Sequence, residues 1–166
     1  MKAAAEELVQ IVDSANHPTG AQPRAIMRKQ GLIHRASYIL VCNDDNKLFI
    51  QKRTATKDIY PGYWDIAAGG VVLAGESYDT SARRELGEEL GVTDTPLEYL
   101  FDHYYQDDNN KVWGAVYRCR HNGPFVLQKE EVEYGVFISV SEILENRDKR
   151  RYTPDGIEIL KRLHQP

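Results

Sequence analysis

The chain has 166 residues, of which 42% are hydrophobic and 28% are charged, and its formal net charge is −4. A chain of this length is expected to form one domain whose core needs no disulfide or structural metal. The acidic balance argues against a nucleic-acid duplex as partner, and the longest apolar run, residues 66–74, is far too short to span a bilayer.

The N-terminal part of the chain predicts a strand followed by a helix. Residues 8–13 are rich in β-branched side chains and precede NHPTG, which is a turn signal. Pro23 suits the first position of a helix, and Gly31 suits the position just past its end. We expect residues 1–33 to extend a single domain whose core is formed by residues 34–166.

Two pairs of strands are expected in the middle of the chain. The runs at residues 38–42 and 48–51 flank the turn NDDN, which favours an antiparallel hairpin. Residues 60–64, YPGYW, predict a loop because Pro-Gly fixes a turn. The aromatic and β-branched runs at residues 97–105 and 112–120 flank DDNN and predict a second antiparallel pair.

Three further helices and one strand complete the expected elements. Ser77 is expected to cap a helix that Gly91 closes. The run at residues 136–140 predicts a strand, after which Ser141 is expected to cap a short helix. Thr153 is expected to open the last helix.

The two cysteines, Cys42 and Cys119, lie far apart in apolar, strand-like surroundings. Because disulfides are rare in reducing compartments, we interpret both as buried free thiols of a soluble, cytoplasmic protein.

Three carboxylates are crowded into the sequence RELGEEL. Each helical residue turns about 100°, so Glu85, Glu88 and Glu89 fall on one face of the predicted helix. This acidic face borders the apolar stripe that contains Leu86 and Leu90. Like charges repel, so either solvent screens them on a plain surface helix or a cation neutralises them. Clustered oxygen ligands of this kind suit Mg²⁺ or Mn²⁺.

The spacing around these glutamates resembles the signature of the Nudix hydrolase family, GX5EX7REUXEEXGU, in which U is a bulky aliphatic residue. Residues 70–92 meet every specified position. The resemblance implies an α/β/α sandwich with a mixed sheet. It also implies a Mg²⁺- or Mn²⁺-dependent hydrolase that cleaves a phosphoanhydride bond in a nucleoside diphosphate linked to another group. In this family the loop at Gly70 brings the backbone close to metal and phosphate.

The same resemblance implies a role for each charged residue of the signature. Glu85 and Glu89 match metal-binding glutamates. Glu88 matches a residue that often joins them, and we expect it to take part in catalysis as well. Glu76 and Arg84 match a pair that forms an orienting ion pair, which is a structural role.

A second resemblance, to isopentenyl-diphosphate isomerase and its Nudix relatives, is carried by HRASYIL (residues 34–40), QKRTATK (residues 51–57) and YPGYWD (residues 60–65). In the isomerase, the positions that match Arg53 and Lys57 contact the substrate diphosphate. A guanidinium and an ammonium are chemically suited to that task. The alternative interpretation of both side chains is a solvated strand end.

The isomerase chemistry itself is not expected here. Its catalytic cysteine position matches Gly69, one of its ligand histidines matches Val71, and an earlier one falls near Met27. His34 matches a ligand position, but one histidine cannot form that metal site. The resemblance is therefore interpreted as one of architecture.

The segment QKEEVEYGVF, residues 128–137, supplies a further candidate. Glu131 aligns with the catalytic, metal-binding glutamate of the isomerase, and Nudix hydrolases often use a glutamate from this loop as ligand or base. A solvated acidic loop is the alternative. The expected partner is a small-molecule diphosphate, a homodimer is possible within this family, and a non-catalytic nucleotide or metabolite sensor is the competing function.

Overall fold

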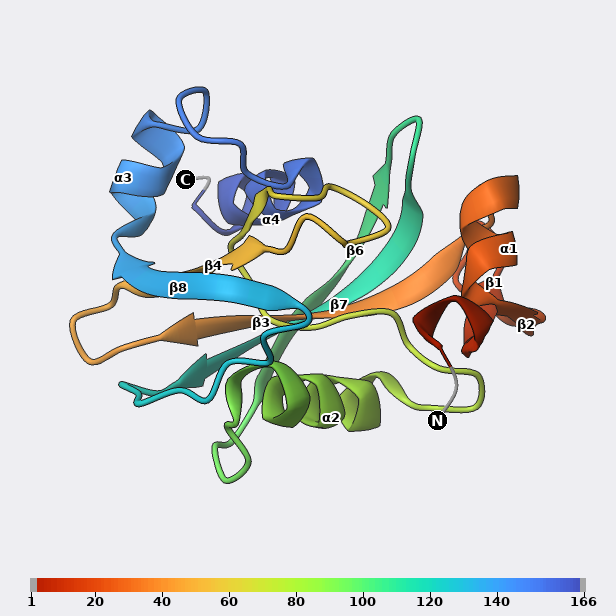
Figure 1. The fold of residues 1–166 in the computed structure, drawn as a ribbon, viewed down its shortest axis with the longest axis horizontal. Coiled ribbons are helices and arrows are strands. Elements are labelled where there is room, and N and C mark those ends of the chain that lie inside the picture. The colour runs from red at the N-terminus through yellow and green to blue at the C-terminus, as the bar shows by residue number, and fades with distance from the viewer. Residues whose placement is uncertain (1–2, 165–166) are drawn as a thin grey trace.

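The computed structural model describes residues 3–164, which form one eight-stranded mixed sheet with helices on both faces (Figure 1). At the centre of the sheet, β3 pairs in parallel with β7 along its whole length, from His34↔Val112 to Cys42↔Arg120. In chain order the elements are the 3₁₀ helix η1 (Ala4–Glu6), β1 (Leu8–Val12), β2 (Pro18–Pro23), α1 (Arg24–Gln30), β3 (His34–Cys42), β4 (Leu48–Arg53), β5 (Trp64–Asp65), α2 (Tyr78–Leu90), β6 (Glu98–Gln106), β7 (Lys111–Arg120), β8 (Val132–Ile138), α3 (Val140–Glu145) and α4 (Pro154–Leu163).

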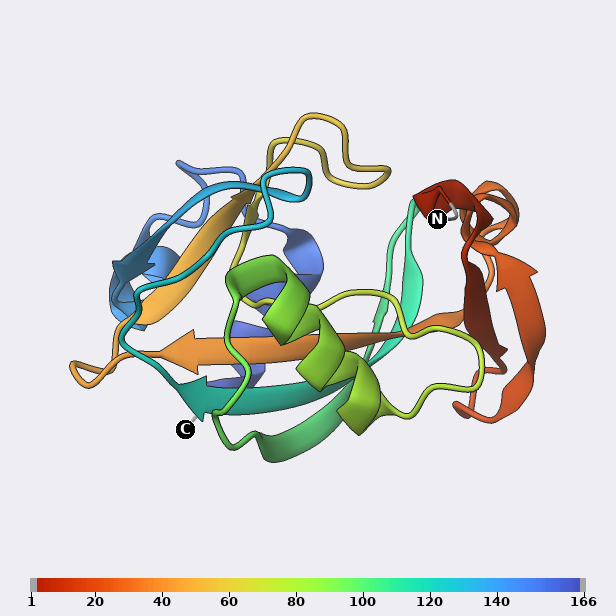
Figure 2. The same ribbon diagram turned by 60° about the horizontal axis from the view of Figure 1, so that its bottom comes forward.

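The alternation of side chains along β3 builds the two layers of core. Ile39 and Val41 point to the face covered by α2, where they pack in one cluster with Leu86. Leu40 points to the opposite face and packs in a second cluster with Ile159 of α4. Figures 1 and 2 show α2 on one side of the sheet and α3 and α4 on the other. This is the α/β/α sandwich that was expected.

The expected hairpin between the third and fourth strands forms only at its turn. β3 and β4 are paired at Cys42↔Leu48 and then diverge. β4 continues antiparallel to β8, whereas β3 continues beside β7. The expected antiparallel pair at the DDNN turn is present as β6 and β7.

The segment that leads into α2 lies against β3. The Ser37 amide donates to the Gly70 carbonyl at 3.0 Å, and the Ile39 amide donates to the Ala68 carbonyl at 2.7 Å. Farther along, the Gln10 amide of β1 donates to the Val72 carbonyl at 3.0 Å. Backbone hydrogen bonds to two strands therefore fix the glycine loop that precedes the glutamate helix.

The N-terminal segment contains one strand more than expected. β2 covers the predicted NHPTG turn in part and pairs antiparallel with β1. Its residues are almost all exposed, so no apolar alternation marks it as a strand. Pro23 is the residue before α1 rather than its first helical position, and Gly31 closes α1 with φ +62°.

Most helix boundaries follow the expected capping residues. The Ser77 hydroxyl accepts from the Thr80 amide at 3.1 Å, and Gly91 ends α2 with φ +69°. In α3 the capping residue is Ser139, whose hydroxyl accepts from the Glu142 amide at 3.3 Å. The expectation of Ser141 was wrong because β8 ends at residue 138, earlier than predicted.

Both cysteines are free thiols. Cys119 is buried, as expected, but Cys42 is only half-buried because it ends β3 at the turn. Among residues 3–164, none of the helices is long and apolar enough to cross a membrane.

Candidate active-site cleft

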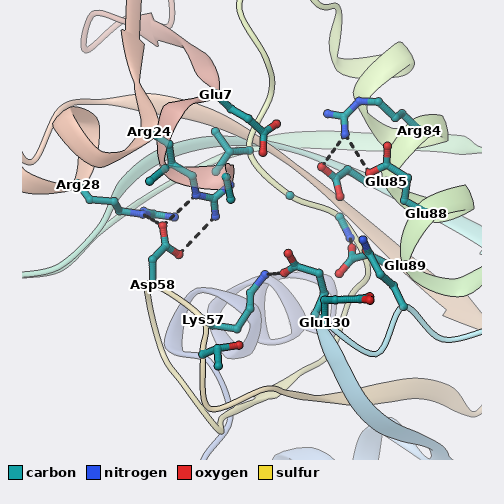
Figure 3. A pocket seen from close by; sticks show the side chains of 18 of the residues that line it. Glu7, Arg24, Arg28, Lys57, Asp58, Arg84, Glu85, Glu88, Glu89 and Glu130 are labelled. Atoms are coloured by element: carbon teal, nitrogen blue, oxygen red, sulfur yellow. Dashed lines mark hydrogen bonds and ion pairs between the residues drawn. The ribbon is translucent and has the colours of Figure 1, made fainter. Parts of the chain in front are cut away.

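A cleft with a volume of about 450 Å³ lies between α2, α1 and the two loops at residues 54–63 and 121–131 (Figure 3). Carboxylates outnumber cations among its charged lining side chains, so the cleft carries an excess of negative charge. The carboxylates are Glu7, Asp58, Glu85, Glu88, Glu89, Glu130 and Glu131, and the cations are Arg24, Arg28, Lys57 and Arg84.

The three glutamates of α2 lie along the side of the helix that faces the cleft. Glu89 is buried, with 6% of its surface exposed, and its Oε1 accepts from the Gly69 amide at 2.8 Å. The Glu85 side chain is 16% exposed, and that of Glu88 is 50% exposed. Because Leu86 anchors α2 in the core beside them, the acidic face borders the buried face as expected.

The surroundings of Glu85 and Glu89 disfavour the ionised form of both carboxylates. Burial raises the pKa of Glu89 well above its ordinary value, and the neighbouring Glu85 raises it further, against the opposing effects of Lys57 and the Gly69 amide. Burial also raises the pKa of Glu85, while Arg84 opposes the shift and Glu88 adds to it. A bound cation would relieve both effects, because it stabilises the ionised form.

The chemistry of these donors fits a hard divalent cation. Carboxylate oxygens are the ligands that Mg²⁺ and Mn²⁺ prefer, and the excess negative charge of the cleft favours a cation there. Within residues 3–164, no three acidic, histidine or cysteine side chains already gather closely enough to form a ready coordination shell. Binding would therefore draw the glutamates together.

Arg84 connects three of the four glutamates of the signature. Its Nε and Nη2 donate to the two carboxylate oxygens of Glu76 at 2.7 and 3.0 Å. Its Nη1 donates to Glu85 Oε1 at 3.0 Å and to Glu88 Oε2 at 3.3 Å. The Glu76–Arg84 ion pair is therefore present, and it aims the remaining guanidinium nitrogen at two of the predicted metal ligands.

Gly69 cannot carry a side chain in this backbone, and a side chain on Gly70 would displace the Glu85 carboxylate. Gly69 has φ +134°, and a Cβ there would lie 2.0 Å from the Ser37 carbonyl oxygen. A Cβ on Gly70 would lie 2.8 Å from the Cδ and Oε1 atoms of Glu85. Gly70 thus gives Glu85 its place, and the backbone at Gly69 has no room for the cysteine of an isomerase.

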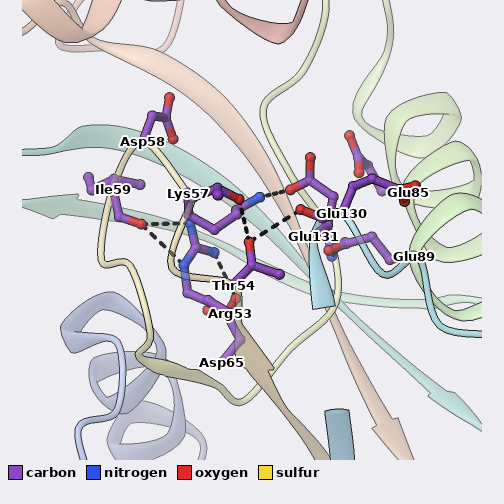
Figure 4. A network of polar contacts seen from close by, with 12 residues as sticks. Arg53, Thr54, Lys57, Asp58, Ile59, Asp65, Glu85, Glu89, Glu130 and Glu131 are labelled. Carbon is purple, nitrogen blue, oxygen red and sulfur yellow. Dashed lines mark hydrogen bonds and ion pairs between the residues drawn. The ribbon is translucent and has the colours of Figure 1, made fainter. Parts of the chain in front are cut away.

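The loop at residues 54–63 brings Lys57 into the cleft, where its ammonium forms an ion pair with Glu131 (Figure 4). Arg53 lies deeper. Its Nε and Nη2 donate to the Ile59 carbonyl at 3.2 and 2.8 Å, and its Nη1 donates to Asp65 at 2.8 Å. Of the two predicted diphosphate contacts, Lys57 lies in the cleft, and Arg53 holds the loop.

An inner cavity of about 80 Å³ adjoins the cleft, and Arg53 and His34 are among the residues that line it. His34 is 2% exposed, and burial, with the nearby Arg28, lowers its pKa to about 3. The other two positions that were compared with isomerase histidines, Met27 and Val71, pack in an apolar cluster. His34 therefore stands as a neutral histidine apart from the glutamates of α2.

Sequence reasoning missed Arg24 and Arg28, which form the wall of the cleft opposite α2. Arg24 donates to the two carboxylate oxygens of Asp58 at 2.8 and 3.3 Å, and the Arg28 Nε donates to the same carboxylate at 3.2 Å. Their spacing of four residues could have indicated that both lie on one face of α1, and the buried Met27 marks the core side of that helix.

Comparison with known proteins gives a consistent result. The NUDIX domain pattern matches residues 32–162. The uncharacterized Nudix hydrolase PA4841 of Pseudomonas aeruginosa is 42% identical over 155 residues, which cover 93% of this chain and 92% of the relative. The uncharacterized Nudix hydrolase YfcD of Escherichia coli is 42% identical over 157 residues, which cover 95% of this chain and 86% of that protein. The crystal structure of DR0079 from Deinococcus radiodurans superimposes with a TM-score of 0.85 at 21% identity, over 96% of this chain and 100% of that one.

Proposed function

The chain belongs to the Nudix hydrolase family, and on that premise we propose that it is a Mg²⁺- or Mn²⁺-dependent enzyme that cleaves a phosphoanhydride bond in a nucleoside diphosphate linked to another group. Members of this family act on pyrophosphate bonds and generally use divalent metals. The observation that carries the proposal is that acidic and basic side chains face each other across one cleft. The glutamates of α2 form one wall, Arg24 and Arg28 form the other, and Lys57 lies between the two walls.

In the proposed mechanism, Glu85 and Glu89 would hold the metal, and Glu88 would join them. A divalent cation bound there would cancel charge on the diphosphate and lower the pKa of water. Arg84 keeps Glu85 and Glu88 oriented through its hydrogen bonds to both. Gly70 lines the cleft, and its lack of a side chain leaves space for the Glu85 carboxylate.

The Lys57–Glu131 ion pair supports separate roles for its two members, phosphate binding for Lys57 and general-base catalysis for Glu131. When substrate enters, the Lys57 ammonium moves to a phosphate oxygen, which leaves the Glu131 carboxylate free to act as general base. Glu131, with Glu88 as the second candidate, takes a proton from the attacking water. A new oxygen–phosphorus bond then forms, and the bridging oxygen leaves with its phosphoryl group. The products are two phosphorylated molecules, or a monophosphate and phosphate.

The test is release of phosphate or monophosphate from a panel of ADP-ribose, NADH, dinucleoside polyphosphates, CDP, dGTP and CoA with Mg²⁺. We expect one class of substrate to be hydrolysed, and Glu89→Gln to lower kcat by at least about a hundredfold. Arg118→Gln, on the exposed side of β7, is the matched control and is expected to retain full activity. Equal turnover by the native protein and Glu89→Gln would refute the mechanism.

A non-catalytic nucleotide or metabolite sensor on the same fold is the competing function. The presence of Glu85, Glu88 and Glu89 in the cleft weighs against it, because a sensor has no need to activate water. If a nucleotide binds but neither the native protein nor Glu89→Gln hydrolyses any member of the panel, the sensor function replaces the hydrolase.

A place in the isomerase branch stays a prediction, and isomerase chemistry is disfavoured by the lack of room for a side chain at Gly69. Interconversion of isopentenyl diphosphate by the native protein would reverse that conclusion. A cytoplasmic location and a homodimer also stay predictions, the first supported by the free thiols Cys42 and Cys119.

A further inference from the structure

We propose that Arg24 and Arg28 form a second anion site in the cleft, which binds a phosphate group of the substrate in addition to the scissile diphosphate. In the free protein, Asp58 occupies this site. The inference rests on the proposed hydrolase function and narrows it to substrates that carry at least three phosphate groups.

The two arginines have the geometry of a phosphate clamp. They lie one helical turn apart on α1, and their side chains are only 19% and 17% exposed. Arg24 approaches the two oxygens of the Asp58 carboxylate with two nitrogens, which is the bidentate arrangement that guanidinium groups also adopt with phosphate. Arg28 adds a third hydrogen bond to the same carboxylate and is itself oriented by Asn110, at 3.3 Å.

The charges do not balance within this cluster. Two guanidinium groups share one carboxylate, so the site keeps an excess positive charge. A phosphate carries more negative charge than a carboxylate and offers more acceptor oxygens. An incoming phosphate can therefore displace Asp58, whose side chain is 37% exposed.

The position of the cluster defines which part of the substrate it contacts. Figure 3 shows Arg24 and Arg28 across the cleft from the side chains of Glu85 and Glu88. Lys57 lies between the two walls, beside Glu131. A diphosphate held at the α2 wall would be within reach of Lys57, and only a further phosphate would reach α1.

The loop that carries Asp58 has other attachments to the rest of the molecule. The loop at residues 54–63 is already held by Arg53, which donates to the Ile59 carbonyl and to Asp65. Thr54 adds a hydrogen bond to the Glu130 carbonyl at 3.2 Å. We therefore attribute the contact of Asp58 with the two arginines to neutralisation of their charge rather than to loop attachment alone.

The first experiment measures binding of inorganic pyrophosphate by titration calorimetry in EDTA, where no hydrolysis can occur. Asp58→Asn is expected to bind pyrophosphate at least about tenfold more tightly than the native protein. Adding Arg24→Gln or Arg28→Gln to Asp58→Asn is expected to reverse that gain, whereas adding Arg118→Gln leaves it intact. A purely structural role predicts no gain for Asp58→Asn, and the absence of a gain would overturn the proposal. Circular dichroism verifies that each variant is folded.

The second experiment uses the panel with Mg²⁺ and separates the sources of the extra phosphate. ADP-ribose has only a diphosphate, dGTP has a third phosphate in the chain, and CoA has a diphosphate with a separate phosphate monoester. For the substrates with a third phosphate that are hydrolysed, Arg24→Gln and Arg28→Gln are expected to raise KM about tenfold with kcat within about twofold.

The outcomes distinguish the site from the reaction. If hydrolysis depends on Glu89 but ADP-ribose is the preferred substrate and the arginine variants match the native protein, the second site is refuted and the hydrolase stands. If nothing in the panel is hydrolysed but Asp58→Asn binds pyrophosphate through the arginines, the hydrolase is refuted and the anion site stands.

Discussion

His34 is a buried histidine whose ionisation opposes folding. Its Nδ1 lies 3.2 Å from the Leu32 carbonyl, so this nitrogen carries the proton of the neutral ring. Burial and the nearby Arg28 lower its pKa to about 3, from an ordinary value of 6.5. Below pH 6.5 the unfolded chain therefore takes up a proton that the folded chain does not bind.

The free energy of unfolding is consequently expected to fall as the pH falls from about 6.5 to about 3, with a contribution from His34 of up to about 1.4 kcal/mol per pH unit. His34→Asn keeps a donor for the Leu32 carbonyl and removes this titration, so its stability should depend less on pH in that window. Urea denaturation at several pH values measures the difference. His17→Asn, on an exposed loop, is the control, and an equal pH slope in the native protein and His34→Asn would contradict the prediction.

At the same scale, the sequence predicted part of the candidate site. The glutamates of α2 were predictable because helix geometry alone places them on one face. Arg53 was expected to contact substrate, but the structure engages it with Ile59 and Asp65, and a local pattern cannot reveal such partners. Arg24 and Arg28 were missed because their role depends on where α1 packs, which is a long-range property.

The α2 helix contains one glycine with room for a side chain. A Cβ on Gly87 would meet Thr93 Cγ2 at 3.6 Å and the Val92 carbonyl oxygen at 3.9 Å, both ordinary contacts. Glycine inside a helix costs about 0.5–1 kcal/mol relative to alanine. Gly87→Ala is therefore expected to stabilise the protein by that amount and to raise Tm by roughly 1–4 °C without loss of activity.

Scanning calorimetry checks this prediction, with Gly91→Ala as the contrasting variant. Gly91 has φ +69°, and a Cβ there would lie 2.9 Å from the Val126 Cβ, so the same substitution should lower Tm. A lower Tm for Gly87→Ala would show that the end of α2 is packed more tightly than these distances indicate.

Elements that are determined by contacts close in the sequence were predicted more accurately than those that depend on distant segments. Ser77 and Gly91 cap the two ends of α2 through contacts within one helical turn, and both were predicted. The separation of β3 from β4 was not, because β3 pairs with β7 from a distant part of the sequence. β2 was missed because its exposed residues carry no apolar period and its pairing with β1 is set by the backbone.

For the whole molecule, a divalent cation is expected to act as a stabilising ligand whose effect depends on pH. The folded-state pKa values of Glu85 and Glu89 are raised above 4.5, so the metal-free protein loses stability as the pH rises from about 4.5 through those values. Mg²⁺ bound to the ionised carboxylates would reverse this loss.

Magnesium should therefore raise Tm in EDTA-stripped protein more at about pH 8 than at about pH 5. Glu89→Gln keeps an acceptor for the Gly69 amide and is expected to be more stable than the native protein at the higher pH in EDTA, with a smaller response to Mg²⁺. Thermal denaturation followed by circular dichroism measures both. The same magnesium shift at the two pH values would argue against these glutamates as ligands.

The walls of the cleft come from stretches that are widely separated along the chain, from Glu7 and α1 to the loop that contains Glu131. During synthesis the glutamate helix leaves the ribosome well before that loop does. The proposed substrate site is therefore incomplete until the loop that contains Glu131 has left the ribosome, so substrate is not expected to assist the earlier stages of co-translational folding.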